Sequence, residues 1–176
     1  MVLINIAYTA PINRPGQHPV LTTPQVWAGL VRKVRHAQEF VPVIESCAVA
    51  SEETNAAGQL VVTRYVNFGQ AAPVPASGGE GGEVKEVCTL FPPHRVDFVQ
   101  DDGTRVWNHV SQGPGKDGED LYLTYVFEAR DDAVEDGSPD AAALEERFKT
   151  TAKRAVESSI ETIRRLVSEG KLQSIT

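Results

Sequence analysis

The chain shows two kinds of hydrophobic periodicity, one typical of strands and one typical of helices. Apolar and polar residues alternate in seven segments that are rich in β-branched and aromatic side chains, as expected for half-buried strands. These segments cover residues 3–13, 43–53, 59–69, 84–93, 94–100, 104–113 and 120–130. Turn-forming sequences such as TNAAG, DDG and GPGKDGED separate several of the later segments, so we predict an antiparallel meander.

Helical spacing appears in two other places. Thr23 is predicted to cap a first helix with Pro24 at its first helical position, and the helix is expected to break into two short helices around residues 37–40. Its apolar stripe comprises Val26, Trp27, Leu30, Val31 and Val34. A second stripe of apolar residues at helical spacing predicts a long C-terminal helix over residues 140–170.

The order of these elements predicts a single α+β domain over residues 1–176. A helix with one apolar stripe must bury it against another layer, and the sheet is the only large partner. We therefore expect a curved, seven-stranded antiparallel sheet around the long helix, with room for a ligand between them. The Gly- and Pro-rich residues 70–83 are predicted to be a flexible hairpin tip, and residues 130–140 an acidic linker.

The element order resembles the helix-grip fold of Bet v 1-type allergens, START lipid-transfer domains and bacterial aromatase/cyclases. The segments VTRYVNFG, EVCTLFPPHRVDFV, TRVWNHVSQGPG and DLYLTYVFEA are similar to the AtaL-like branch of that superfamily, which is mostly fungal. The resemblance implies a cavity for a hydrophobic small molecule and a natural-product context. It implies no particular reaction, because the branch has no defined chemistry that can be carried over to residues of this chain.

The composition of the chain disfavours nucleic acid and membranes as binding partners. The net charge of −7 and the pI of about 5.1 disfavour binding to nucleic acid, and no apolar run approaches the ~20 residues of a membrane-spanning helix. The N-terminus lacks the features of a signal peptide, and the two cysteines, Cys47 and Cys88, are expected to be free thiols. We therefore predict a cytoplasmic protein that is a monomer or a weak dimer.

One predicted strand places a charge on its apolar face. Leu60, Val62, Val66 and Phe68 share that face with Arg64 because alternate side chains of a strand point the same way. A buried arginine needs an acceptor, and Glu86 holds the equivalent place on the next strand. The pair is either structural, or Arg64 is a polar anchor that binds a ligand carboxylate or carbonyl or stabilises an oxyanion.

Three further polar side chains are candidates for the site. His109 could act as a general base, and its neighbour Asn108 lies between two valines, but the sequence leaves open which of the two points inward. Tyr125 shares an apolar face with neighbouring strand residues, and its hydroxyl is either satisfied within the wall or available to a ligand carbonyl. With Arg64 and Glu86, the catalytic candidates are thus His109 and Tyr125.

The remaining candidates are the expected wall of the cavity. Its predicted ligand-contacting residues are Trp27, Val62, Val66, Phe68, Cys88, Leu90, Phe98, Asn108, Leu123, Phe127 and Phe148. The histidines His18, His36, His94 and His109 show no metal-ligand spacing, and the chain has no dinucleotide or phosphate-binding fingerprint, so we predict neither a metal nor a cofactor.

Three functions are compatible with such a cavity. The first is a cofactor-independent cyclase, dehydratase or isomerase of fungal secondary metabolism that acts on a hydrophobic, polyketide-like molecule. The second is a binding or carrier protein for the same class of ligand without catalysis. The third is a module that grips a partner peptide, which would require an exposed apolar patch.

Overall fold

The computed structural model describes residues 1–68 and 82–172. The predicted hairpin tip at residues 70–83 lies almost entirely outside the described residues. The elements are β1 (Val2–Pro11), α1 (Thr23–Arg35), the 3-10 turn η1 (Ala37–Glu39), β2 (Ile44–Thr54), β3 (Leu60–Phe68), β4 (Glu83–Phe91), β5 (Arg95–Gln100), β6 (Arg105–Gln112), β7 (Leu121–Asp131) and α2 (Pro139–Ser168). The predicted seven strands, first helix and long C-terminal helix are confirmed in that order.

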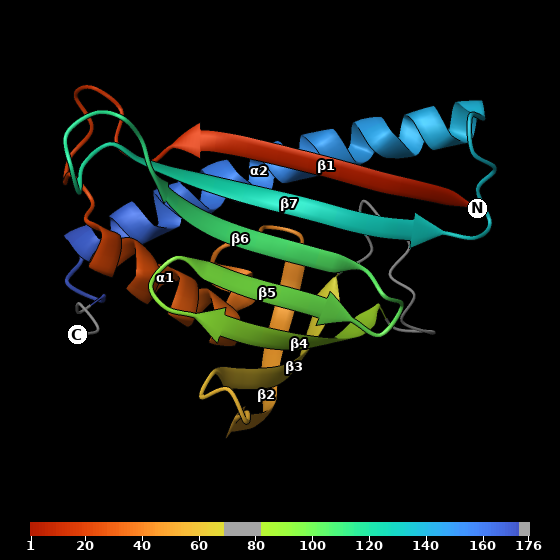
Figure 1. Cartoon of the computed structure of the whole chain (residues 1–176), viewed down its shortest axis with the longest axis horizontal. Helices are drawn as coiled ribbons and strands as arrows, with labels where there is room; N and C mark the ends of the chain where they lie inside the picture. The colour runs from red at the N-terminus through yellow and green to blue at the C-terminus, as the bar shows by residue number, and fades with distance from the viewer. Residues whose placement is uncertain (69–81, 173–176) are drawn as a thin grey trace.

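The strands form one antiparallel sheet in the order β1-β7-β6-β5-β4-β3-β2, which is the predicted meander with β1 added beside β7 (Figure 1). Two irregularities in β2, between Ile44 and Ser46 and between Val49 and Ser51, bend that strand. In Figure 1, β2 accordingly runs at a steep angle to β5, β6 and β7. The sheet is therefore strongly curved.

Both helices cover the same face of the sheet. α2 extends behind β1 and β7 in Figure 1. The predicted stripe on this helix is buried except for its last residue, which is half-buried; it comprises Leu144, Phe148, Ala152, Val156, Ile160, Ile163 and the half-buried Val167. Ser138 accepts a hydrogen bond from the backbone N–H of Ala141 at the start of α2, at 3.1 Å. The acidic linker between β7 and α2 is shorter than predicted, since β7 continues to Asp131 and α2 begins at Pro139.

The first helical region differs from the prediction in two details. The N-cap is Thr22 rather than Thr23, because the Thr22 N–H donates to the side chain of Gln25 at 2.9 Å and closes a capping box. The second short helix is only the single turn of η1, after which the chain turns into β2. Cys47 and Cys88 are both free, as expected.

The two helices cross at a glycine. A Cβ atom on Gly29 of α1 would lie 2.4 Å from Cγ1 of Ile163 on α2, which is closer than real Cβ atoms approach a neighbour. The absence of a side chain at Gly29 therefore allows α1 to pack directly against α2. This contact sets the depth at which α1 lies in the concave face of the sheet.

We predict that Gly29→Ala lowers the free energy of unfolding by about 1–3 kcal/mol through overpacking. Urea denaturation measures the change, and the same Gly29→Ala substitution should cost less in an Ile163→Ala background, where the truncated side chain leaves space for the new methyl group. If helix propensity governed this position, Gly29→Ala would instead stabilise the protein by up to about 1 kcal/mol.

Candidate functional site

A cavity of about 130 Å³ lies between the sheet and α2. Its walls come from α1, the start of β2, strands β3 to β7 and α2. The lining residues are Lys33, Val41, Val43, Ile44, Arg64, Phe68, Val84, Glu86, Phe98, Gln100, Asp102, Thr104, Val106, Tyr125, Phe127, Phe148, Thr151 and Ala155. The volume is close to that of the ~150 Å³ apolar cavities that hold a benzene ring.

Arg64 and Glu86 form the ion pair expected from the sequence. The two residues are directly paired across β3 and β4, and Arg64 Nε and Nη2 donate to the same Glu86 oxygen at 2.8 and 2.5 Å. Burial alone would lower the pKa of Arg64, but its interactions with Glu86 and with the nearby Cys88 and Cys47 together outweigh burial and hold that pKa above its ordinary value. Both side chains are buried and line the cavity.

Arg64 also binds the end of α1. Its Nη1 donates to the backbone carbonyls of Lys33 and Val34 at 2.8 and 2.9 Å. Carbonyls in the last turn of a helix have no partner within the helix, and a positive charge favours that end of the helix dipole. Four of the five N–H groups of Arg64 are thus engaged within the protein.

Lys33 is the residue of this site that the sequence analysis missed. It lies on α1, its side chain is only 6% exposed, and its Nζ donates to Asn108 Oδ1 on β6 at 2.8 Å. The same Nζ lies 4.0 Å from the ring centroid of Tyr125 and 5.4 Å from that of Phe98. A signal was present, because Lys33 stands three residues after Leu30 and seven after Val26, within the apolar stripe of the helix.

The surroundings of Lys33 favour its neutral form. Burial removes water from the ammonium group, and the positive charge of Arg64 opposes a second cation, so the pKa of Lys33 falls from 10.5 to about 7. Glu86 and Cys88 act in the opposite direction but less strongly. Near neutral pH this amine therefore exists in both protonation states.

Asn108 has an unused donor beside this amine. Its side chain is completely buried, and its Nδ2 has no hydrogen-bond partner among the described residues. Because Oδ1 of the same amide accepts from Lys33, Nδ2 is left as the donor. A buried N–H without an acceptor is costly, so Asn108 carries a polar group that the described residues do not satisfy.

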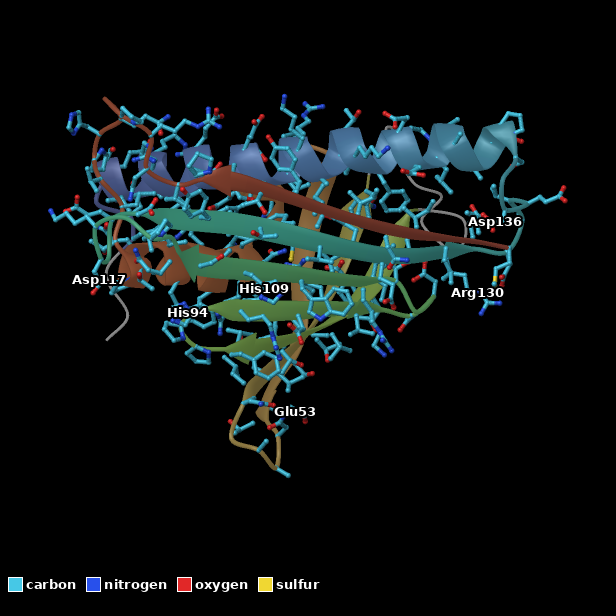
Figure 2. The ribbon with its side chains drawn as sticks, turned by 45° about the horizontal axis from the view of Figure 1, so that its top comes forward. Glu53, His94, His109, Asp117, Arg130 and Asp136 are labelled. Carbon is cyan, nitrogen blue, oxygen red and sulfur yellow. The ribbon has the colours of Figure 1, made fainter. Side chains whose placement is uncertain are left out.

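Tyr125 faces the cavity, whereas His109 faces the outside of the sheet. Tyr125 is buried, lines the cavity and hydrogen-bonds Ser159 of α2 at 2.8 Å, and burial raises the pKa of its hydroxyl. His109 is on the outer face of the sheet, because its neighbour Asn108 occupies the inner face (Figure 2 labels His109 on β6). Burial and nearby Arg95 lower the pKa of His109, but no part of its side chain lines the cavity.

The predicted wall residues divide into two groups. Phe68, Phe98, Phe127 and Phe148 line the cavity. Trp27, Val62, Val66, Cys88, Leu90 and Leu123 are buried in the adjoining core and do not line it, and Asn108 reaches it only through its contact with Lys33. That these residues contact a ligand stays a prediction. The structure adds Gln100, Asp102 and Thr104 to the wall, near the β5–β6 turn.

Two other properties concern the described residues as a whole. No helix among them is long and apolar enough to cross a membrane. Over residues 1–68 and 82–172, no group of three or more His, Cys, Asp or Glu side chains is arranged to hold a metal ion.

Comparison with known proteins gives the family. A model of the family described as acetylaranotin biosynthesis cluster protein L, AtaL, matches residues 6–170. The chain belongs to the AtaL family. The acetylaranotin biosynthesis cluster protein L of Aspergillus terreus is 30% identical over 169 residues, which are 96% of this chain and 93% of that protein.

Two solved structures share the fold of this AtaL family member. StfQ, a di-domain ARO/CYC from the steffimycin biosynthetic pathway, superimposes with a TM-score of 0.58 at 10% identity, over 96% of this chain and 51% of StfQ. BexL, a di-domain ARO/CYC from the BE-7585A biosynthetic pathway, gives 0.56 at 14% identity, over 93% and 49%. The chain spans about half the length of each. These similarities confirm the predicted helix-grip fold.

We predict that Arg64→Leu lowers the free energy of unfolding by about 3–5 kcal/mol, because it leaves Glu86 charged, buried and without its partner. The matched control is Arg35→Leu, which breaks the bidentate Arg35–Glu52 pair, whose side chains are 29% and 36% exposed. That change should cost at most about 1 kcal/mol. Equal losses in chemical denaturation would contradict the role assigned to Arg64.

Because the pKa of Lys33 is low in the folded protein, the free energy of unfolding should depend on pH. Between about 7 and 10.5 the unfolded chain carries a proton on Lys33 that the folded protein lacks. The free energy of unfolding should therefore rise with pH in this range, by up to about 1.4 kcal/mol per pH unit, and this gain is absent below pH 7.

A Lys33→Met variant lacks this pH-dependent contribution, because methionine does not titrate. We expect the stability of the wild type, measured against this variant, to increase from about pH 7 towards pH 10 in urea denaturation. Lys153→Met, at an exposed position on α2, is the control and should show no such trend. A constant difference between wild type and Lys33→Met would mean that Lys33 titrates at its ordinary pKa.

Proposed function

We propose that the protein binds a hydrophobic, polyketide-like small molecule of fungal secondary metabolism and acts on it as a cofactor-independent cyclase, dehydratase or isomerase. The observation that carries the proposal is a buried, titratable amine, Lys33, in the wall of an otherwise largely apolar cavity. The context comes from the name of the Aspergillus terreus relative, which assigns it to a biosynthesis cluster.

The cavity has the properties that such a reaction requires. Four phenylalanines, Phe68, Phe98, Phe127 and Phe148, supply flat apolar walls for an unsaturated or aromatic chain. Cyclisation and dehydration of polyketide-like chains proceed through enols, so a proton must leave the carbon beside a carbonyl. A base with a pKa near 7 is well matched to that step, and Lys33 is such a base.

The side chains around Lys33 orient its amine. The buried Asn108 accepts a hydrogen bond from Nζ through Oδ1. Tyr125 holds its ring beneath the amine and its hydroxyl on Ser159. In this scheme Arg64 and Glu86 are positioning residues, because most of their hydrogen-bonding capacity is used within the protein.

A surface hollow between the 41–43 segment and α2 offers a path for the ligand. It is lined partly by the charged residues Glu146, Arg147 and Arg154. It shares Val41, Val43, Thr151 and Ala155 with the cavity. A molecule longer than the cavity could extend through this neck.

A carrier without catalysis is the second candidate, and one observation favours it. Of the four side chains predicted to be catalytic, Arg64 and Glu86 are engaged with each other and His109 is on the outer face. Only Tyr125 remains at the cavity with its role open. The distinction between enzyme and carrier therefore depends on Lys33.

We expect the protein to bind 1-tetralone, a bicyclic aromatic ketone, and to speed exchange of its α-protons in D₂O, followed by NMR. Ala155→Phe should abolish both effects by filling the neck between cavity and surface, whereas Ala142→Phe, at an exposed position on α2, should leave them intact. Binding without faster exchange would identify a carrier. Absence of both in the wild type would refute the proposed function.

A further inference from the structure

Lys33 has a second chemical capability that general base catalysis does not use. A neutral primary amine in a cavity is a nucleophile towards carbonyl carbon as well as a base. Lysines that form Schiff bases are typically desolvated in apolar surroundings or placed next to another cation. Lys33 meets both conditions, since it is 6% exposed and has the buried guanidinium of Arg64 as a neighbour.

We propose that Lys33 condenses with a ketone of the bound ligand to form a protonated Schiff base, which makes the protein a covalent, amine-dependent catalyst for β-dicarbonyl substrates. This inference deepens the proposed function and rests on it. It names the nucleophile, Nζ of Lys33, and the substrate class, molecules that carry a ketone two carbons from a second carbonyl. Polyketide-like chains contain that unit.

The step balances without an outside oxidant or reductant. Nζ attacks the carbonyl carbon and forms a C–N bond, while the C–O π electrons move to oxygen. The oxygen takes one proton from the attacking nitrogen and one from solvent, then leaves as water when the C–N double bond forms. The cationic nitrogen then withdraws electrons from the adjacent carbon, so a water molecule takes the α-proton and the C–H electron pair forms the C–C double bond of an enamine.

The surroundings of Nζ suit each stage. Asn108 Oδ1 accepts a hydrogen bond from the amine at 2.8 Å, which orients the nitrogen lone pair. The ring of Tyr125, with its centroid 4.0 Å from Nζ, stabilises the cation that the Schiff base retains.

The charge balance of the site also favours this product. The charged groups facing Nζ are Arg64 on β3 and Glu86 on β4, and these two neutralise each other through their direct ion pair. Cys88 is nearby but stays a thiol, because burial raises its pKa to about 12. Glu86 is therefore already engaged by Arg64, and the other carboxylate in the cavity wall, Asp102, lies in the β5–β6 turn and accepts the backbone N–H of Thr104.

The test uses pentane-2,4-dione, a small 1,3-diketone that condenses with a primary amine to a stable, ultraviolet-absorbing enaminone. Near pH 7.5 the wild type should gain the mass of one diketone less one water, and peptide mapping should place the adduct on Lys33. Labelling of Lys33 should be at least about tenfold faster than that of exposed lysines, because a much larger fraction of it is neutral.

Two variants make the assignment specific. Lys33→Met should lose the fast adduct, and Lys153→Met, at an exposed position, should keep it. Circular dichroism checks that Lys33→Met is folded. If it is not, competition by 1-tetralone in the wild type replaces it, since a ligand in the cavity must protect Lys33 and not the exposed lysines.

The outcomes separate this inference from the function on which it rests. A rapid, ligand-protected adduct on Lys33 supports the Schiff base. Faster α-proton exchange of 1-tetralone without any adduct on Lys33 overturns the covalent step but leaves the proposed function, with Lys33 acting only as a base. Loss of adduct, binding and exchange together refutes both.

Discussion

The site depends on the way in which one arginine is neutralised in the interior. Arg64 leaves water completely, so its charge and its donors must be matched by the protein. Glu86 balances the charge from the neighbouring strand, and two carbonyls in the last turn of α1 accept from Nη1. The guanidinium therefore fastens the end of a helix to the middle of the sheet, and two of the separate elements that build the cavity meet at this residue.

The same interaction decides the chemistry of Lys33. Arg64 fixes the backbone carbonyl of Lys33, and that places the lysine side chain over Tyr125 and against Asn108. Two cations and one carboxylate then share the interior, and the carboxylate is already held by Arg64. The site is closest to electrical balance when Lys33 gives up its proton. The buried charge of Arg64 thus adds to the effect of desolvation in lowering the pKa of Lys33.

Much of the fold follows from local patterns in the sequence. Alternation in β3 and β4 was sufficient to pair Arg64 with Glu86, because a meander makes consecutive strands neighbours and one register places two charges opposite each other. The stripe of α2 likewise follows from its helical period. These features rest on contacts between residues of one element or of adjacent strands, which sequence spacing describes well.

The parts of the site that could not be predicted from the sequence depend on how elements distant in the chain pack together. Lys33 belongs to the apolar stripe of α1, but whether a lysine there is buried depends on the depth of the helix, which the contact of Gly29 with Ile163 determines. The sequence also left undecided which face of β6 points inward, because Asn108 and His109 are both polar. Only the partner on α1 shows that Asn108 is the inner one.

Packing alone does not explain the amine. A methionine at position 33 would fill nearly the same volume over Tyr125 without the cost of desolvating an ammonium group, and an apolar residue in place of Asn108 would remove a buried polar group that lacks a full set of partners. Replacing such a buried polar pair by well-packed apolar residues is often neutral or stabilising. Stability alone therefore gives no reason to prefer the lysine and asparagine over an apolar pair, and carbonyl chemistry at Nζ is a property that the apolar pair lacks.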